Sequence, residues 1–61
     1  MPLVTVQAVS GRTVDQKRGL VRDITEAFVK NYNVKPDAVT ITLIDLTKDS
    51  VAKEGKLFID R

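Results

Sequence analysis

The sequence predicts an α/β (α+β) protein with one domain, residues 1–61: a βαβ unit of two parallel strands and one long helix, then a short C-terminal hairpin. Two observations support this fold class. Segments 3–9 and 39–46 are rich in β-branched residues, and a stretch with helical periodicity lies between them. Because a whole helix connects the strands, we expect them to be parallel, with a right-handed crossover.

The first segment, residues 3–9, alternates between two faces as a strand does. One face carries Val4, Val6 and Ala8, and the other carries Leu3, Thr5, Gln7 and Val9. Ser10 and Gly11 then interrupt the pattern. Thr13 is followed by Gln16 three positions later, which is the pattern of a capping box. We therefore expect Thr13 to be the N-cap of the helix.

Helical periodicity begins at Val14 and stops before Pro36, so Asn33 or Val34 is the last position that a helix can reach. At 100° per residue the apolar side chains fall in one arc. They are Leu20, Val21, Ile24, Ala27, Phe28 and Tyr32. Charged residues occupy the opposite arc, so this helix has one side to bury against the sheet.

The second strand is predicted over residues 39–46. Val39, Ile41 and Leu43 share one face, and Thr40, Thr42, Ile44 and Leu46 share the other. The tail that follows contains two short apolar pieces around Lys53, Glu54, Gly55 and Lys56, which predicts a small hairpin or strand.

A chain of this size needs additional stabilisation. Below about 70–80 residues, a single core rarely supplies more than about 3–5 kcal/mol. The sequence has no cysteine for disulfides and no histidine for a metal site. One helix covers only one sheet face, and the other face retains Leu3, Val9, Ile44 and Leu46. We therefore predict a homo-oligomer in which another copy covers that face.

The charge pattern excludes several classes of partner. Ten basic and eight acidic residues give a net charge of +2, and the two signs alternate along the chain. The basic residues form no patch of the kind that binds nucleic acid. No apolar run is long enough to span a membrane, and no secretory signal precedes the first strand. We expect a cytoplasmic protein with no nucleic-acid or membrane partner, no metal and no cofactor.

Two residues could carry chemistry without histidine or cysteine. Pro2 follows the initiator methionine, and methionine is normally removed before a small residue. Removal would leave a free secondary amine, which titrates near neutral pH and can act as a general base. An apolar pocket beside a cation would lower the pKa of that amine further. Arg12, just before a helix N-terminus, has a planar guanidinium suited to a substrate carboxylate.

The chain resembles the 4-oxalocrotonate tautomerase family over essentially its whole length. The resemblance rests on Met1-Pro2, the hydrophobic strand, Ser10-Gly11-Arg12-Thr13, and Asp15-Gln16-Lys17 at the start of an amphipathic helix, with Gly55 in the tail. It implies a tautomerase that moves a proton in an unsaturated α-keto acid, using Pro2 as base and Arg12 as carboxylate ligand. It also implies that Val9 and Val51 contact a small carboxylate-bearing enol or keto substrate. Family members usually assemble as hexamers, trimers of dimers, so the resemblance also implies a hexamer here.

Three positions depart from the family pattern. Thr40 stands where the family has a second arginine, Val51 where it has an aromatic residue, and Lys53 where it has an apolar one. Without a cation at residue 40, binding of a dicarboxylate is weakened; Lys48 or Lys53 could replace the charge. The alternative interpretation is a catalytically degenerate protein of the same fold, acting as a scaffold or as one subunit of a hetero-oligomer.

Overall fold

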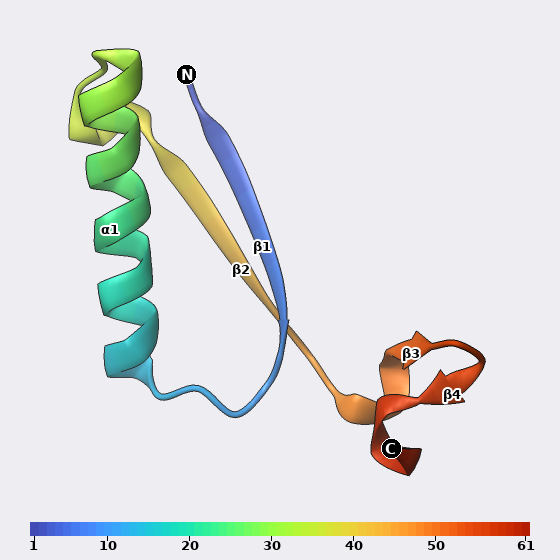
Figure 1. Ribbon diagram of the computed structural model, residues 1–61. Coiled ribbons are helices and arrows are strands. Elements are labelled where there is room, and N and C mark those ends of the chain that lie inside the picture. Colours follow the sequence, from blue (N-terminus) through green and yellow to red (C-terminus); the bar gives the residue numbers. More distant parts are fainter.

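The computed structural model describes residues 1–61 and confirms the predicted βαβ unit (Figure 1). Strand β1 (Leu3–Val9) leads through a loop into helix α1 (Val14–Tyr32), and strand β2 (Thr40–Leu46) returns beside β1. The two strands are parallel, with Leu3 opposite Thr40 and Val9 opposite Leu46. The C-terminal segment projects away from the far end of the sheet (Figure 1).

Helix α1 begins and ends close to the predicted residues. Thr13 is the N-cap, with a complete capping box: its hydroxyl accepts a hydrogen bond from the Gln16 backbone N–H at 3.1 Å, and the Gln16 side chain accepts one from the Thr13 N–H at 2.9 Å. Asn33 ends the helix in the left-handed conformation, with φ 55°. Asparagine tolerates the left-handed backbone conformation at a helix end.

The second strand begins one residue later than predicted. Val39 is the C-cap of a short 3₁₀ helix, η1 (Pro36–Ala38), and its N–H donates to the Pro36 carbonyl at 3.2 Å. The strand therefore starts at Thr40. Proline at the first position sets the backbone angle that this turn requires, and hydrophobic alternation alone does not reveal it.

The predicted tail hairpin is confirmed, with 3₁₀ turns on both sides. Helix η2 (Lys48–Ser50) precedes strand β3 (Ala52–Lys53), which pairs antiparallel with β4 (Lys56–Leu57), and η3 (Phe58–Asp60) ends the chain. The Phe58 N–H donates to the Val51 carbonyl at 2.8 Å and closes the base of the hairpin.

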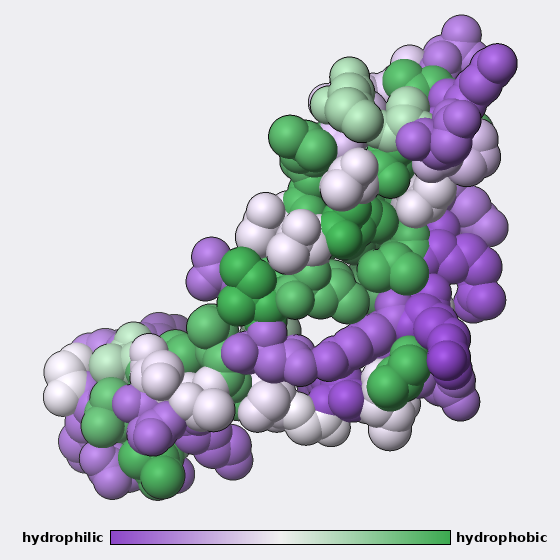
Figure 2. Space-filling model, turned by 180° about the vertical axis from the view of Figure 1, so that it is seen from behind, coloured by the Kyte–Doolittle hydropathy of each residue, from purple (hydrophilic) through white to green (hydrophobic).

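The isolated chain has no enclosed core. No residue is buried, and the accessible surface is 5024 Å², against about 4,000 Å² for a compact monomer of this mass. The radius of gyration is 14.6 Å, where a compact chain of this length has about 10.5 Å. In Figure 2 hydrophobic surface extends over the strands, beside the hydrophilic outer side of α1. A large apolar surface is therefore left without a partner.

That apolar surface includes the sheet face predicted to be uncovered. Leu3 is 75% exposed and Ile44 is 40% exposed, while Val9 and Leu46 on the same face are half-buried. The predicted apolar arc of α1 is only partly covered, because Leu20 and Tyr32 remain 43% and 66% exposed. One helix over two strands leaves a flank of the helix, as well as the second sheet face, without contacts.

Candidate active site

Pro2 lies at the open N-terminal end of β1. Its carbonyl accepts a hydrogen bond from the Thr40 N–H at 3.1 Å, which fixes its backbone against the start of β2. Pro2 is half-buried, whereas Met1 is 89% exposed. While Met1 is attached, the Pro2 nitrogen is a tertiary amide and has no basic lone pair. Removing this exposed residue would create a secondary amine at a fixed place on the sheet.

The residue nearest to Pro2 on the neighbouring strand carries no charge. Thr40 is the first residue of β2, pairs with Leu3 in the register, and donates its N–H to Pro2. A longer basic side chain at this position would start beside Pro2. Thr40 places only a hydroxyl and a methyl group there, so this chain supplies no cation next to Pro2 from residue 40.

Arg12 lies in the loop between β1 and α1, immediately before the N-cap. Its side chain lines a hollow of about 270 Å³ together with Gln16, Lys17 and Leu20. Arg12 takes part in none of the ion pairs of the chain. Its exposed guanidinium therefore has all its N–H donors available for a carboxylate.

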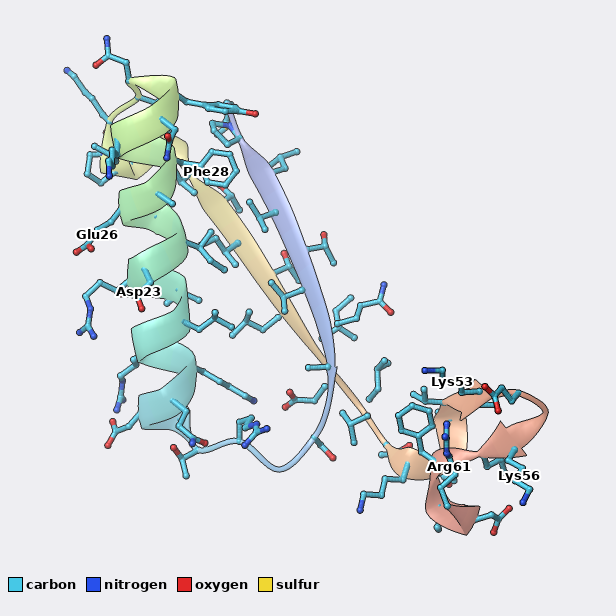
Figure 3. All side chains as sticks on the ribbon, in the orientation of Figure 1. Asp23, Glu26, Phe28, Lys53, Lys56 and Arg61 are labelled. Carbon is cyan, nitrogen blue, oxygen red and sulfur yellow. The ribbon has the colours of Figure 1, made fainter.

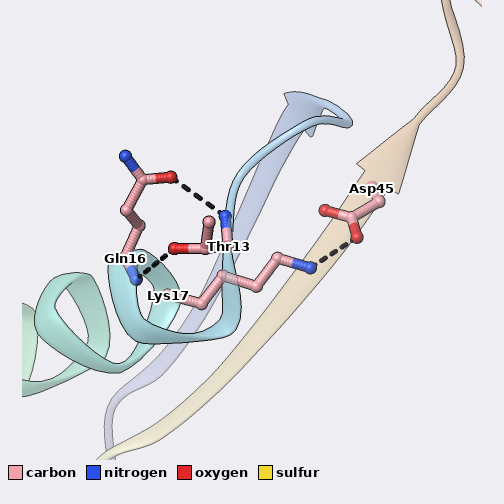
Figure 4. Close-up of polar contacts among 4 residues, drawn as sticks. All are labelled: Thr13, Gln16, Lys17 and Asp45. Atoms are coloured by element: carbon pink, nitrogen blue, oxygen red, sulfur yellow. Dashed lines mark hydrogen bonds and ion pairs between the residues drawn. The ribbon is translucent and has the colours of Figure 1, made fainter.

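An ion pair that the sequence pattern did not predict joins the helix that follows the Arg12 loop to strand β2 (Figure 4). The Lys17 ammonium lies 2.5 Å from a carboxylate oxygen of Asp45 and joins the first turn of α1 to the end of β2. The two side chains are 31% and 49% exposed, so the pair contributes at most about 1 kcal/mol. The sequence contained a hint of this pair. Asp45 alternates with Ile41 and Leu43, so it lies on the strand face that α1 covers, and Lys17 falls within the apolar arc of the helix.

Val9 and Val51 occupy different regions of the single chain. Val9 is half-buried at the end of β1 and lines, with Arg12, Lys17 and Ile44, a small cavity of about 50 Å³. Val51 is half-buried in the C-terminal segment, where its carbonyl accepts from Phe58. Only Val9 and Arg12 share a cavity, so one chain brings together part of the predicted site.

Pro2 and Arg12 are separated by the length of the first strand. Its seven residues extend over about 20 Å, at roughly 3.3 Å per residue. A small carboxylate cannot reach both groups of the same chain. If both act on one substrate, they must come from two different copies.

No cluster of three His, Cys, Asp or Glu side chains that could hold a metal ion is present. No helix combines the length and apolar character that crossing a bilayer requires.

A family model described as "Tautomerase enzyme" matches residues 2–61. The chain belongs to the tautomerase family. A probable tautomerase of Bradyrhizobium diazoefficiens is 46% identical over 61 residues, which cover 100% of this chain and 91% of that protein. The 2-hydroxymuconate tautomerase of Bacillus subtilis is 37% identical over 60 residues, covering 98% of this chain and 97% of that one.

Solved structures of tautomerases share the fold. A 4-oxalocrotonate tautomerase isozyme from Methylibium petroleiphilum has a TM-score of 0.93 and 36% identity, with 97% of this chain and 92% of that chain covered. A crystal structure described as a homologue of 4-oxalocrotonate tautomerase also has a TM-score of 0.93, at 35% identity and 98% coverage of both chains. The family expected from the Pro2, Arg12 and helix-start motifs is thus confirmed, and the chain is a small tautomerase-family isomerase.

Proposed function

We propose that this tautomerase uses the free amine of Pro2 as a general base. Pro2 removes a proton from a carbon α or γ to the carbonyl of an unsaturated α-keto acid, and then returns it to another carbon. Between the two transfers the substrate is a dienolate, and Arg12 binds its carboxylate by charge-assisted hydrogen bonds. The observation that carries this proposal is the position of Pro2, fixed by its bond to Thr40 behind an exposed Met1.

An α-amine suits this role because the ordinary pKa of such a group lies near neutral pH, and a general base works best when its pKa is close to the working pH. The chain has no histidine that could take its place. Val9 and Val51 supply apolar contacts to the substrate in this proposal. Apolar surroundings favour the neutral amine over the ammonium ion, which keeps the base ready to accept a proton.

The site is shared between copies of the chain. Pro2 of one copy acts with Arg12 of another, because a single strand separates the two residues by about 20 Å. The uncovered sheet face and the expanded shape of the lone chain support a closed homo-oligomer. A hexamer built as a trimer of dimers is the assembly that we propose. We place it in the cytoplasm.

A monocarboxylate fits this site better than a dicarboxylate. Arg12 offers one guanidinium for one carboxylate, and Thr40 beside Pro2 offers no second charge. A buried carboxylate without a cationic partner is costly. We therefore propose an enol-pyruvate type compound, with one carboxylate, as the preferred substrate.

Ketonisation of phenylenolpyruvate, followed by absorbance, tests the proposal. A positioned general base contributes about 10²- to 10⁴-fold, and Pro2→Ala replaces the ring amine by a mobile primary amine. We expect Pro2→Ala to lower kcat/KM at least tenfold. The matched control is Pro36→Ala, which changes the other proline of the chain at η1 and should keep the activity. Equal rates for the processed protein and Pro2→Ala would contradict the proposal.

A second candidate function is favoured by the neutral residue beside Pro2. A tautomerase-fold chain that lacks this cation would serve as one subunit of a hetero-oligomer, with the other chain supplying an arginine, or as a scaffold. Under this alternative the purified chain is inactive alone. It co-purifies with a second small chain, and mixing the two restores activity. An active homo-oligomer excludes it.

A further inference from the structure

The C-terminal hairpin directs two lysines to the same side. Its two-residue loop, Glu54 and Gly55, has φ of 54° and 79°, the positive angles of a tight type I′ hairpin turn. Lys53 and Lys56 flank this loop and are direct partners in the antiparallel register. Direct cross-strand partners project from the same face, with Cβ atoms about 5 Å apart. The backbone therefore places the Lys53 and Lys56 side chains on the same face of the hairpin.

A third cation is held at the base of the same hairpin. The Arg61 guanidinium carbon lies 5.6 Å from the centroid of the Phe58 ring, and the Arg61 N–H donates to the Phe58 carbonyl at 3.2 Å. Phe58 is itself half-buried against the hairpin. All three cationic side chains belong to the segment that projects from the sheet (Figure 3). Together with Glu54 they line one hollow of about 380 Å³, which has no apolar side chain in its wall.

The charges around this hollow are not balanced. The ion pairs of the chain join Lys17 to Asp45, Arg18 to Asp15 and Arg22 to Asp23, and none involves the hairpin. Among the side chains that line the hollow, three cations and one carboxylate leave an excess of two positive charges (3 − 1), which the terminal carboxylate of Arg61 lowers to one. Like charges directly opposite each other destabilise a strand pair, and each strand of this pair has only two residues. A bound anion would remove that repulsion.

We propose that Lys53, Lys56 and Arg61 form a binding site for a small doubly charged oxyanion, a phosphate group or a pair of carboxylates. The Arg61 guanidinium provides a planar pair of N–H donors for two oxygens, and the lysines provide point charges around them. The hollow has the size of a small-molecule site, which is typically about 300–1,000 Å³. Within one chain this site lies in the hairpin that follows β2, whereas Pro2 precedes β1. Lys53 belongs to it, although this residue could also supply a cation to the tautomerase substrate.

The test uses the whole assembled protein, titrated separately with inorganic phosphate and with succinate at constant ionic strength set by chloride. Backbone amide shifts in residues 53–57 and at Arg61 report binding, and the melting temperature reports stabilisation. We expect saturable shifts with at least one of the two anions. Saturation by phosphate alone assigns a phosphate group, and saturation by succinate alone assigns a dicarboxylate. The absence of saturable shifts with both anions, or equal shifts in a control titration with chloride alone, would overturn the proposal.

The diagnostic variant is Lys53→Gln/Lys56→Gln, and the matched control is Lys35→Gln, an exposed lysine outside the hairpin. We expect the double variant to bind the anion at least tenfold more weakly, while the control binds normally. Without anion the double variant should melt at the same or a higher temperature, since it loses the like-charge repulsion. Unchanged anion affinity in the double variant would refute the site. Loss of assembly in the double variant would also refute it, because the cations would then pair with carboxylates of another copy.

The outcome is separable from catalysis. Pro2→Ala should bind the anion as the unaltered protein does, whatever its activity. A loss of tautomerase activity with intact anion binding would therefore speak only about Pro2, and a loss of anion binding with intact activity only about the hairpin.

Discussion

Replacing Ile44 by aspartate should dissociate the oligomer that we propose for this chain. Ile44 lies on the sheet face that α1 does not cover and is 40% exposed in the isolated chain. Burying the exposed part of the Ile44 side chain against another copy contributes about 1 kcal/mol to the free energy of association, since burying a whole isoleucine side chain contributes about 1.5–3 kcal/mol. A carboxylate there adds a desolvation cost of several kcal/mol. The sum of about 5 kcal/mol per buried site weakens association at least roughly a thousandfold.

Sedimentation velocity and circular dichroism at micromolar concentration provide the assay. The unaltered chain should sediment as an oligomer, and its melting temperature should rise with protein concentration because unfolding is coupled to dissociation. Ile44→Asp should sediment near the mass of one chain and lose helical signal. Val14→Asp is the matched control: Val14 is 60% exposed at the first residue of α1, where a carboxylate complements the helix dipole.

Either of two results would contradict an oligomer interface that contains Ile44. One is an Ile44→Asp protein that stays assembled at the concentration at which the unaltered protein is assembled. The other is an unaltered protein that is a folded 6.8 kDa monomer at micromolar concentration, which would also exclude a site shared between copies.

Three further outcomes are expected. Arg12→Gln should lower kcat/KM roughly 10- to 100-fold, mainly through KM, because a charge-assisted hydrogen bond contributes about 1.5–3 kcal/mol; an unchanged KM would contradict the carboxylate role. Thr13→Ala should lower the free energy of unfolding by about 1 kcal/mol, because it removes the capping box. Chemical denaturation at fixed protein concentration measures this loss. Asp45→Asn should change the free energy of unfolding by less than about 1 kcal/mol, because its pair with Lys17 is partly exposed, so a larger loss would contradict a weak, solvent-screened pair.

Local rules predicted most of the fold. The capping pattern of Thr13 and Gln16 located the start of α1, and the alternation in residues 3–9 gave the strand faces that the register confirms. These features are visible because each depends on residues close in the chain. The 3₁₀ turns were not predicted, since they depend on backbone angles that many sequences tolerate. Val39 shows this: its alternation continues that of β2, but its N–H closes η1.

The candidate site was predictable only in part. The residue types of Pro2 and Arg12 indicated a base and a carboxylate ligand, but their separation along β1 follows from the parallel fold. The Lys17–Asp45 pair joins residues 28 positions apart, and the charge balance of the hairpin requires knowing which cations lack partners. Such contacts between distant residues are fixed by packing and not by local pattern.

The proposed base of this protein is the free amine of Pro2. The most direct test of this role measures intact mass and ketonisation rate on the same sample, before and during treatment with a methionine aminopeptidase. Protein that retains Met1 should be inactive, because its Pro2 nitrogen is an amide, and activity should rise in proportion to the fraction that has lost Met1. Full activity in protein that retains Met1 would contradict this role of Pro2.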